Sequence, residues 1–409
     1  MPAEEPENNR TEENMNSLIR GLMAATALAS LTTIACAQDV SGVIAGLPTE
    51  LKAQYDGAPQ KMLPSAWDNF TPPPKPWKWC HSESYQGNPW RVTVTKELKR
   101  LVDGLIADGT VASFEVSDSN NDASQQINQI RAFIDKKCSI ITSIPGSATA
   151  LDDAIDAAAK AGIPFITAAG SVTSPNAINV DSNYARWGYD MMTAIGKAMP
   201  DGGSVLLVEG IAGHPIVVQE RQGGDKALAE NSKLKVSRSV NGNWTANVTK
   251  TAVLQAIATN PAPIDAVWTT GSESRVVAEA FAEAGRPAPL ITGSITGDAL
   301  GYWKANPDKY RFEGHAVLPH WTAETLFRVG VRMLDGQKPK LNTLLIPIPP
   351  VHNADLGAWY KDCMTPDAVS IFPVPPKDPM PEEWLDAYFA NPAPTKGWDY
   401  SKVPDACAK

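Results

Sequence analysis

From residue 77 onward, short apolar runs alternate with longer segments in which apolar residues recur at helical spacing. Between residues 123 and 134 an apolar side chain returns every three or four positions, which predicts a helix, and the apolar run 140–144 predicts a buried strand. The pattern continues with helices expected at 151–161, 221–230, 247–258 and 275–284, and with strands expected at 164–168, 204–208, 266–269 and 290–292. This alternation predicts an α/β protein with parallel sheets covered by helices on both faces. Roughly ten such units exceed one comfortable sheet, so we expect two lobes.

Two segments lack this rhythm. Residues 38–76 are Pro-rich and weakly periodic, and they close with the run Pro72-Pro73-Pro74-Lys75-Pro76. Such a leader is expected either to pack on the surface or to stay mobile. The tail is dense in proline and tryptophan, and we interpret residues 361–409 as a C-terminal extension.

The N-terminus carries an expected export signal. The apolar stretch 21–34 is shorter than the about 20 residues that span a bilayer, and Ala35-Cys36-Ala37 after it is a small-residue cleavage pattern. Residues 1–14 hold five glutamates against one arginine, whereas a signal peptide begins with a basic or neutral region. We therefore interpret residues 1–37 as an over-long start plus a signal peptide, with translation from Met15 and cleavage after Ala37.

Two alternatives to this interpretation are less favoured. A buried helix would need a polar face, which the apolar stretch lacks. Lipidation of Cys36 would anchor the protein, but Thr33 stands where a lipoprotein cleavage box usually has leucine. The favoured location is the periplasm, with lipoprotein anchoring as the minority alternative.

The net charge of −9 argues against nucleic acid or an anionic membrane surface as a partner. Four cysteines remain after the expected cleavage, and an even number in an oxidising compartment permits disulfides. A bond between Cys363 and Cys407 would staple the tail. A bond between Cys80 and Cys138 would require the first and third strands to be neighbours. Free buried thiols are the open alternative.

Signatures of catalysis are missing from the sequence. It has no phosphate-binding P-loop, no His-Glu-x-x-His zinc helix and no Gly-x-Ser-x-Gly nucleophile elbow. His315 and His320, with Glu313 and Glu324 nearby, match no common metal-site spacing. The Gly-rich segment 210–213 lacks the third glycine of a dinucleotide site and is better explained as a strand-to-helix turn. We therefore predict no catalytic residues, no metal and no cofactor.

Polar and aromatic residues gather where the expected strands end, which is where open α/β sheets bind ligands. Indole faces can cover the C–H surfaces of a sugar ring, while amide, hydroxyl and guanidinium groups satisfy its hydroxyls. The candidate ligand-binding residues are Tyr85, Asn88, Trp90, Arg91, Ser143, Asp181, Arg221, Trp244, Thr270, Ser272, Ser294 and His320. Structural roles remain open for three of them. Trp244 could fill a groove between helices, Arg91 could be a solvated helix residue, and Ser143 could cap a helix.

Between residues 77 and 340 the chain resembles the periplasmic sugar-binding proteins of ABC importers, the group typified by ribose-binding protein. Each matching segment is loose by itself, but their order and spacing are specific. The segments are Gly87-Asn88-Pro89-Trp90, 118–127, Ala161-Gly162-Ile163-Pro164, Gly210-Ile211-Ala212-Gly213, Glu220-Arg221-Gln222-Gly223-Gly224 and Leu334-Asp335-Gly336-Gln337-Lys338.

The resemblance implies ligand contacts by Asn88, Trp90, Arg221 and Trp244. It also reveals departures, because three family pairs that carry carboxylates are replaced. The replacing pairs are Ala169-Gly170, Gly271-Ser272 and Ser294-Ile295. A pentose or hexose held in the family's usual manner is therefore in doubt. A larger, less polar or anionic ligand is possible, and Arg91 and Arg221 would suit an acid. Asp181 is a candidate replacement for one lost carboxylate.

The resemblance further implies two doubly wound parallel-sheet lobes joined by a three-segment hinge, which is the type I periplasmic binding protein fold. We expect the first lobe at 77–181 and 318–340 and the second at 182–317 and 341–360. The hinge should fall near 180–182 and 317–321. Closure about it would bury the ligand between the lobes.

The predicted function is an exported, monomeric solute-binding protein. It would capture a sugar, polyol or sugar-acid-like ligand and deliver it to an ABC permease. A sensor that presents its bound state to a chemoreceptor or membrane kinase is the main alternative. An enzyme using Asp118 or Glu209 is disfavoured, because no nucleophile–base pair is visible in the sequence.

Overall fold

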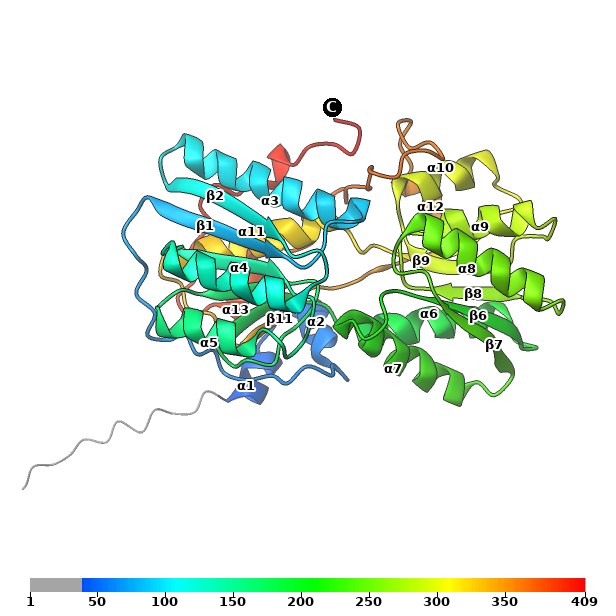
Figure 1. Ribbon diagram of the computed structural model, residues 1–409, viewed down its shortest axis with the longest axis horizontal. Helices are drawn as coiled ribbons and strands as arrows, with labels where there is room; N and C mark the ends of the chain where they lie inside the picture. The colour runs from blue at the N-terminus through cyan, green and yellow to red at the C-terminus, as the bar shows by residue number, and fades with distance from the viewer. Residues whose placement is uncertain (1–38, 409) are drawn as a thin grey trace, which may run out of the picture. The chain divides into compact units, whose positions relative to one another are not determined.

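The computed structural model describes residues 39–408, so the predicted signal peptide and its cleavage site lie outside the described residues. The described chain contains two six-stranded sheets with helices on both faces (Figure 1). All neighbouring strands pair in parallel except the last, short strand of the second sheet. The predicted α/β fold class with two doubly wound lobes is confirmed.

The first lobe is built on a sheet with the strand order β11-β5-β4-β3-β1-β2. Helices α3 and α11 pack against each other on one face, and α4 and α5 cover the other (Figure 1). Every residue of the short apolar strand β3 is buried, as expected for a strand covered on both faces. The strands are β1 (Trp77–Glu83), β2 (Val111–Asp118), β3 (Ile140–Ile144), β4 (Phe165–Ala168), β5 (Ala177–Asp181) and β11 (Thr343–Leu345), and the helices are α3 (Pro89–Ala107), α4 (Ala123–Asp135), α5 (Asp152–Lys160) and α11 (Pro319–Leu334).

The second lobe repeats this design with the strand order β12-β10-β9-β8-β6-β7. Helices α6 and α7 pack together on one face, while α8 and α9 cover the other (Figure 1). The strands are β6 (Gly203–Glu209), β7 (Leu234–Asn241), β8 (Ala266–Thr269), β9 (Leu290–Ser294), β10 (Arg311–His315) and β12 (Pro350–Val351), and the helices are α6 (Tyr184–Ala198), α7 (Pro215–Glu230), α8 (Ala246–Thr259), α9 (Ser274–Glu283), α10 (Gly297–Ala305) and α12 (Leu356–Trp359).

Three segments carry the chain between the two sheets. They follow β5, β10 and β11, so the first two coincide with the predicted hinge positions. The assignment of residues 341–360 to the second lobe is wrong for β11, because this strand pairs in parallel with β5. Only β12 of that range joins the second sheet, where it runs antiparallel to β10. A three-residue strand is too short to show a periodicity that would assign it to a sheet.

The Pro-rich leader packs on the first lobe. It contains the short helices α1 (Val40–Ala45) and α2 (Thr49–Lys52), and the side chains of Leu51 and Trp67 are buried. The Tyr55 hydroxyl donates to the carbonyl of Thr343 at 2.9 Å, and Trp67 Nε1 donates to the carbonyl of Asn176 at 2.9 Å. The leader therefore covers the outer edge of the first sheet. This agrees with the expectation that it packs on the surface, and not with the alternative that it stays mobile.

The C-terminal extension contacts both lobes. The backbone N–H of Gly297 in α10 donates to the carbonyl of Ile371 at 2.8 Å. Further on, helix α13 (Glu382–Tyr388) and its flanks lie against α11, where Arg328 and Arg332 are buried. Arg328 pairs with Asp378 at 3.1 Å and with Glu382 at 2.8 Å. Hydrogen-bonded carboxylates are what makes such deep burial of a guanidinium tolerable.

Both considered disulfides are present. Cys80 of β1 is bonded to Cys138, just before β3, and Cys363 is bonded to Cys407 within the extension. The first pair is possible because β1 and β3 are neighbours in the sheet. Within residues 39–408, the helices are too short or too polar to cross a membrane.

Candidate ligand-binding cleft

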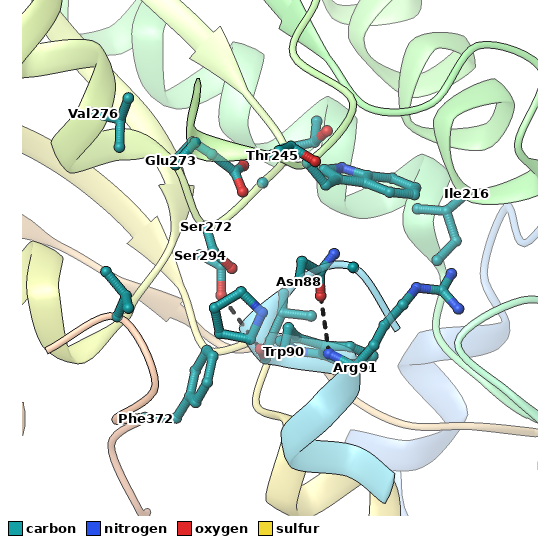
Figure 2. Close-up of a pocket in the computed structure, with 18 of the residues that line it drawn as sticks. Asn88, Trp90, Arg91, Ile216, Thr245, Ser272, Glu273, Val276, Ser294 and Phe372 are labelled. Carbon is teal, nitrogen blue, oxygen red and sulfur yellow. Dashed lines mark hydrogen bonds between the residues drawn. The ribbon is translucent and has the colours of Figure 1, made fainter. Parts of the chain in front are cut away.

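A cavity of about 280 Å³ opens between the two lobes, at the ends of their strands (Figure 2). Its wall combines the loop after β1, the first turn of α6, the start of α7, the loops after β7, β8 and β9, and part of the extension. The principal lining residues are Asn88, Trp90, Arg91, Ala169, Tyr184, Trp187, Ile216, Glu220, Trp244, Thr245, Asn247, Thr270, Ser272, Glu273, Arg275, Val276, Ser294, Asp298, Val317, Val369 and Phe372. This is the position at which open parallel sheets bind ligands.

The Asn88-Pro89-Trp90 loop is fixed by helix capping. The Asn88 side-chain oxygen accepts the backbone N–H of Arg91 at 2.9 Å, and Pro89 occupies the first turn of α3. Trp90 therefore lies at the helix start, where its Nε1 donates to the carbonyl of Val317, in the segment after β10, at 2.9 Å (Figure 2). The indole thus has a satisfied N–H and presents its ring to the cavity.

Arg91 also lines the cavity, but its charge is already matched. Its guanidinium lies 3.4 Å from Glu83 Oε2, 3.0 Å from Ser84 Oγ and 3.3 Å from His214 Nε2 of the second lobe. Arg91 and Glu83 are both buried, which excludes a solvated helix position. Burial, together with the positive charge of Arg91, lowers the pKa of His214 to about 3 and keeps its imidazole neutral.

Trp244 lines the cavity from the other lobe. Its backbone adopts the left-handed conformation, with φ of +51°, which is uncommon for a residue other than glycine. Its ring meets His214 edge to face, with 4.9 Å between the centroids. A Cβ atom added at Gly210 would lie 2.1 Å from this indole. The Gly-rich turn after β6 therefore makes room for Trp244, and it is indeed a strand-to-helix turn.

The floor of the cavity depends on close packing between α6 and α7. A Cβ atom at Gly188 would lie 2.1 Å from the Glu220 carbonyl, and one at Gly223 would lie 1.7 Å from the Ala185 carbonyl. The missing side chains let the two helices approach, and this brings Tyr184 and Trp187 of α6 beside Glu220. No partner among the described residues accepts the indole N–H of Trp187.

Three carboxylates in the wall escaped the sequence analysis. Glu220 is 1% exposed, and neither of its oxygens has a hydrogen-bond partner in the described chain. Burial raises its pKa well above the usual range. Burial and the neighbouring Asp298 raise the pKa of Glu273 to about 7, and its side chain points into the cavity (Figure 2). Asp298, by contrast, pairs with Arg275 Nε at 2.8 Å.

Arg221 points away from the cavity. Its guanidinium lies 2.7 Å from Glu209 and 2.7 Å from Asp225 on the outside of the second lobe. Successive residues of a helix are about 100° apart, so when Glu220 faces the cavity Arg221 must face sideways. The pair Gly223-Gly224 marks the packed side of α7, and residue 220 lies one turn before it on that side. This spacing was the available signal for Glu220.

The structure separates the other candidates into two groups. The group that lines the cavity is Asn88, Trp90, Arg91, Trp244, Thr270, Ser272 and Ser294. Among them, Thr270 Oγ1 is buried without a partner in residues 39–408, while Ser294 Oγ donates to the Val317 carbonyl at 3.3 Å.

Four further candidates lie near the cavity but do not line it. The Tyr85 hydroxyl is 3.3 Å from Thr245 Oγ1, across the cleft. Ser143 Oγ donates to the carbonyl of Ser82 at 2.8 Å and is buried beneath the strand ends. Asp181 accepts the backbone N–H of Gly170 at 3.1 Å and a hydrogen bond from Ser171. His320 lies in α11, where burial lowers its pKa. In the described part of the chain, no cluster of three His, Cys, Asp or Glu residues is arranged to hold a metal ion.

Comparison with known proteins places these features in a family context. The family model described as the periplasmic binding protein domain matches residues 82–337. A search of curated protein sequences gives no significant match.

Solved structures with the same fold include three solute-binding proteins of ABC transporters. The one from Thermobispora bispora is 25% identical, with a TM-score of 0.65, and the match covers 71% of this chain and 90% of that one. The one from Mycobacterium smegmatis, with bound glycerol, is 18% identical, with a TM-score of 0.64 and coverage of 73% and 99%. The one from Bacillus halodurans, with bound myo-inositol, is 19% identical, with a TM-score of 0.62 and coverage of 69% and 97%.

Proposed function

The chain belongs to the family of the periplasmic binding protein domain, whose members bind ligands and are not enzymes, and we propose that it is the solute-binding protein of an ABC importer. In this proposal the protein works in the periplasm as a monomer. It captures a small polyhydroxylated ligand between its lobes and presents the closed form to the import permease.

One observation carries the proposal. The cavity draws its wall from both lobes and is lined by the indoles of Trp90 and Trp244 together with the hydroxyl-bearing residues Thr270, Ser272 and Ser294. Apolar faces combined with hydroxyl and carboxylate groups are what the two sides of a polyol require. Glycerol and myo-inositol in two structures of the same fold support this ligand class.

The hinge supports ligand capture by closure. Trp90 and Ser294 belong to different lobes, and both donate to the Val317 carbonyl in the second crossing segment. A ligand that contacts both Trp90 and Ser294 would therefore bind two side chains, one from each lobe, that are hydrogen-bonded to the same hinge residue. Such coupling between a bound ligand and a hinge is typical of domain closure in binding proteins.

The decisive experiment is a thermal-shift screen of the purified protein, residues 38–409, against neutral and charged sugars and polyols. A ligand that binds only the folded form adds about 2.7 kcal/mol of stability at a concentration of 100 times Kd, so a true ligand raises Tm in a concentration-dependent manner. Mass spectrometry should recover the ligand unchanged. If no compound of these classes raises Tm, or if the ligand is converted, the proposal is wrong.

The export part of the proposal has its own test. Mature protein isolated from the cell envelope should begin at Gln38, which N-terminal sequencing would show directly. A protein that retains Met15 in the cytoplasm, or a mass that indicates a lipid on Cys36, would contradict cleavage after Ala37.

A further inference from the structure

The acidic side chains of the cavity wall, unlike the basic ones, are not all paired in salt bridges. Each cation of the wall already has a carboxylate partner, since Arg91 pairs with Glu83 and Arg275 pairs with Asp298 and Glu279. Two carboxylates of the wall, Glu220 and Glu273, form no salt bridge with any described residue. A ligand that enters the cavity therefore meets two acidic groups and no unpaired cation.

Glu220 is the more unusual of the two. It is 1% exposed, no hydrogen bond of normal geometry reaches its oxygens from residues 39–408, and the neighbouring Thr270 hydroxyl of the same wall offsets the effect of burial only in part. Buried carboxyl groups are nearly always hydrogen-bonded, because an unsatisfied one costs on the order of 1–3 kcal/mol. The fold retains this group at the cavity floor, on the same face of α7 as Ile216. A ligand group that donates hydrogen bonds would remove the cost.

The surroundings of the two carboxylates favour a positively charged donor. Trp90, Trp187, Trp244 and Tyr184 all contribute aromatic surface to the wall. The faces of aromatic rings attract cations, with a gain of about 0.5–2 kcal/mol for each well-placed ring. A neutral hydroxyl could also donate to Glu220, but only a cation would supply a counter-charge that allows the two carboxyl groups to ionise.

We infer that the cleft binds a small ligand that carries a protonated amine together with hydroxyl groups, with Glu220 and Glu273 as the receptors of the ammonium group. An amino sugar or a polyhydroxylated cyclic amine has this chemistry. Because it names the ligand of the same cleft, this assignment rests on the proposed function. It also replaces the expectation of an acidic ligand, since Arg221 faces away from the cavity and Arg91 is already paired.

Protons provide a readout that distinguishes the two ligand classes. Without a ligand, burial keeps the pKa of Glu220 high, and Glu209 of β6 adds to this effect, while Asp298 and burial raise the pKa of Glu273 to about 7. The other titratable groups nearby are Tyr184, next to Glu220, and Arg275, paired with Asp298. An ammonium group requires an ionised carboxylate, so its binding releases a proton from the carboxyl group to solvent. A neutral polyol requires no such release.

The test is calorimetry with matched probes on the mature protein. Glucose, galactose and myo-inositol are compared with glucosamine, galactosamine and an aminodeoxyinositol, and N-acetylglucosamine serves as the neutral control of similar shape. We expect the best amine to bind at least about tenfold more tightly than its neutral counterpart. Titrations at pH 7 in buffers of different ionisation enthalpy should reveal proton release, and the affinity for the amine should rise from pH 6 to pH 7.

The outcomes separate this inference from the proposed function. If a neutral sugar or polyol binds as tightly as its amine counterpart, or more tightly, the amine assignment is overturned and the solute-binding function stands. If no probe binds, both are contradicted. Binding of the amine without proton release would overturn the roles of Glu220 and Glu273.

Isosteric variants test which carboxyl groups cause the preference for the amine ligand. Glu220→Gln should lower the affinity for the amine at least about tenfold and reduce the proton release, and it should lower the affinity for the neutral probes by a clearly smaller factor. Glu273→Gln should act in the same direction. Glu230→Gln is the matched control, because this carboxylate is exposed at the far end of α7, where it accepts a hydrogen bond from the Tyr189 hydroxyl outside the cavity. An equal loss in the control would show a general charge effect and overturn the assignment.

Discussion

The two walls of the cleft differ in how fully their polar groups are satisfied. On the first-lobe wall, Asn88 caps α3, Trp90 donates to the hinge and Arg91 contacts Glu83 and Ser84. On the second-lobe wall, Glu220, Thr270 and Trp187 all hold buried polar atoms without a partner in the described chain. The first wall is therefore satisfied by the protein itself, whereas the second wall keeps buried polar atoms that are available to a ligand.

This difference gives the two walls different roles in ligand binding. A wall with satisfied groups is rigid and offers mainly apolar surface, so it contributes affinity with little discrimination between similar ligands. A buried group that lacks a partner discriminates strongly, because an incorrect ligand leaves it unsatisfied at a cost of about 1–3 kcal/mol. We therefore expect changes on the first wall to alter stability and overall affinity, and changes on the second wall to alter ligand choice.

The largest expected effect comes from breaking the completed wall. Arg91→Ala leaves Glu83 buried without its cation and should lower the free energy of unfolding by about 3–5 kcal/mol, as measured in urea. Lys99→Ala, which removes an exposed ion pair with Asp103 on the same helix, is the control and should cost less than about 1 kcal/mol. Equal effects of the two changes would show that Arg91 is not a structural member of the wall.

The second prediction concerns how the free energy of unfolding depends on pH through Glu273 of the second wall. The pKa of Glu273 is raised from 4.5 to about 7 in the folded protein, so its favourable contribution is complete below pH 4.5 and is lost as the pH rises through 7. Glu273→Gln should abolish this loss. Its stability relative to wild type should therefore increase by up to about 3 kcal/mol between pH 4.5 and pH 8. Denaturant unfolding at both pH values tests this.

The third prediction concerns the two indoles. Replacing Trp90 or Trp244 by alanine should weaken binding of the ligand found in the screen by about 1–3 kcal/mol, because each change removes a large apolar contact. Trp90→Phe keeps an aromatic ring but loses the hydrogen bond to Val317, so it should cost less than Trp90→Ala. Wild-type affinity in both alanine variants would place the ligand outside this cavity.

The smallest effect is expected at Arg221. It pairs with Glu209 and Asp225 at the surface, and such ion pairs contribute about 1 kcal/mol or less. Arg221→Ala should thus change neither the ligand affinity nor the unfolding free energy by more than about 1 kcal/mol. A tenfold loss of affinity in calorimetry would restore the family-based expectation that this arginine holds the ligand.

Much of the fold could be predicted because its signal is repeated along the chain. Nine strands, β1 to β3 and β5 to β10, are each followed directly by a helix, and each βα unit gives evidence for the same architecture. The expected strands did not include β5, β7, β10, β11 or β12, and β11 has only three residues, too few to show a periodicity. Its place beside β5 is fixed by long-range pairing and by the leader that covers it.

The site was predictable where local sequence determines geometry. The Asn-Pro-Trp loop places Trp90 through capping, and the loops after β8 and β9 place Ser272 and Ser294 at the strand ends. Glu220 and Arg221 are adjacent in sequence, so only the packing of α7 on α6 determines which of them faces the cavity. Phe372 comes from the extension, which has no periodic pattern and whose path depends on tertiary contacts.

The path of the extension has a mechanical consequence. Ile371 is held on the second lobe by Gly297, and Asp378 is held on the first lobe by Arg328. The seven residue steps between these anchors can span at most about 25 Å when fully stretched. The extension would therefore limit the separation of the two lobes in any opening motion. Because Phe372 lines the cavity, such a motion would also act on a side chain of the candidate site.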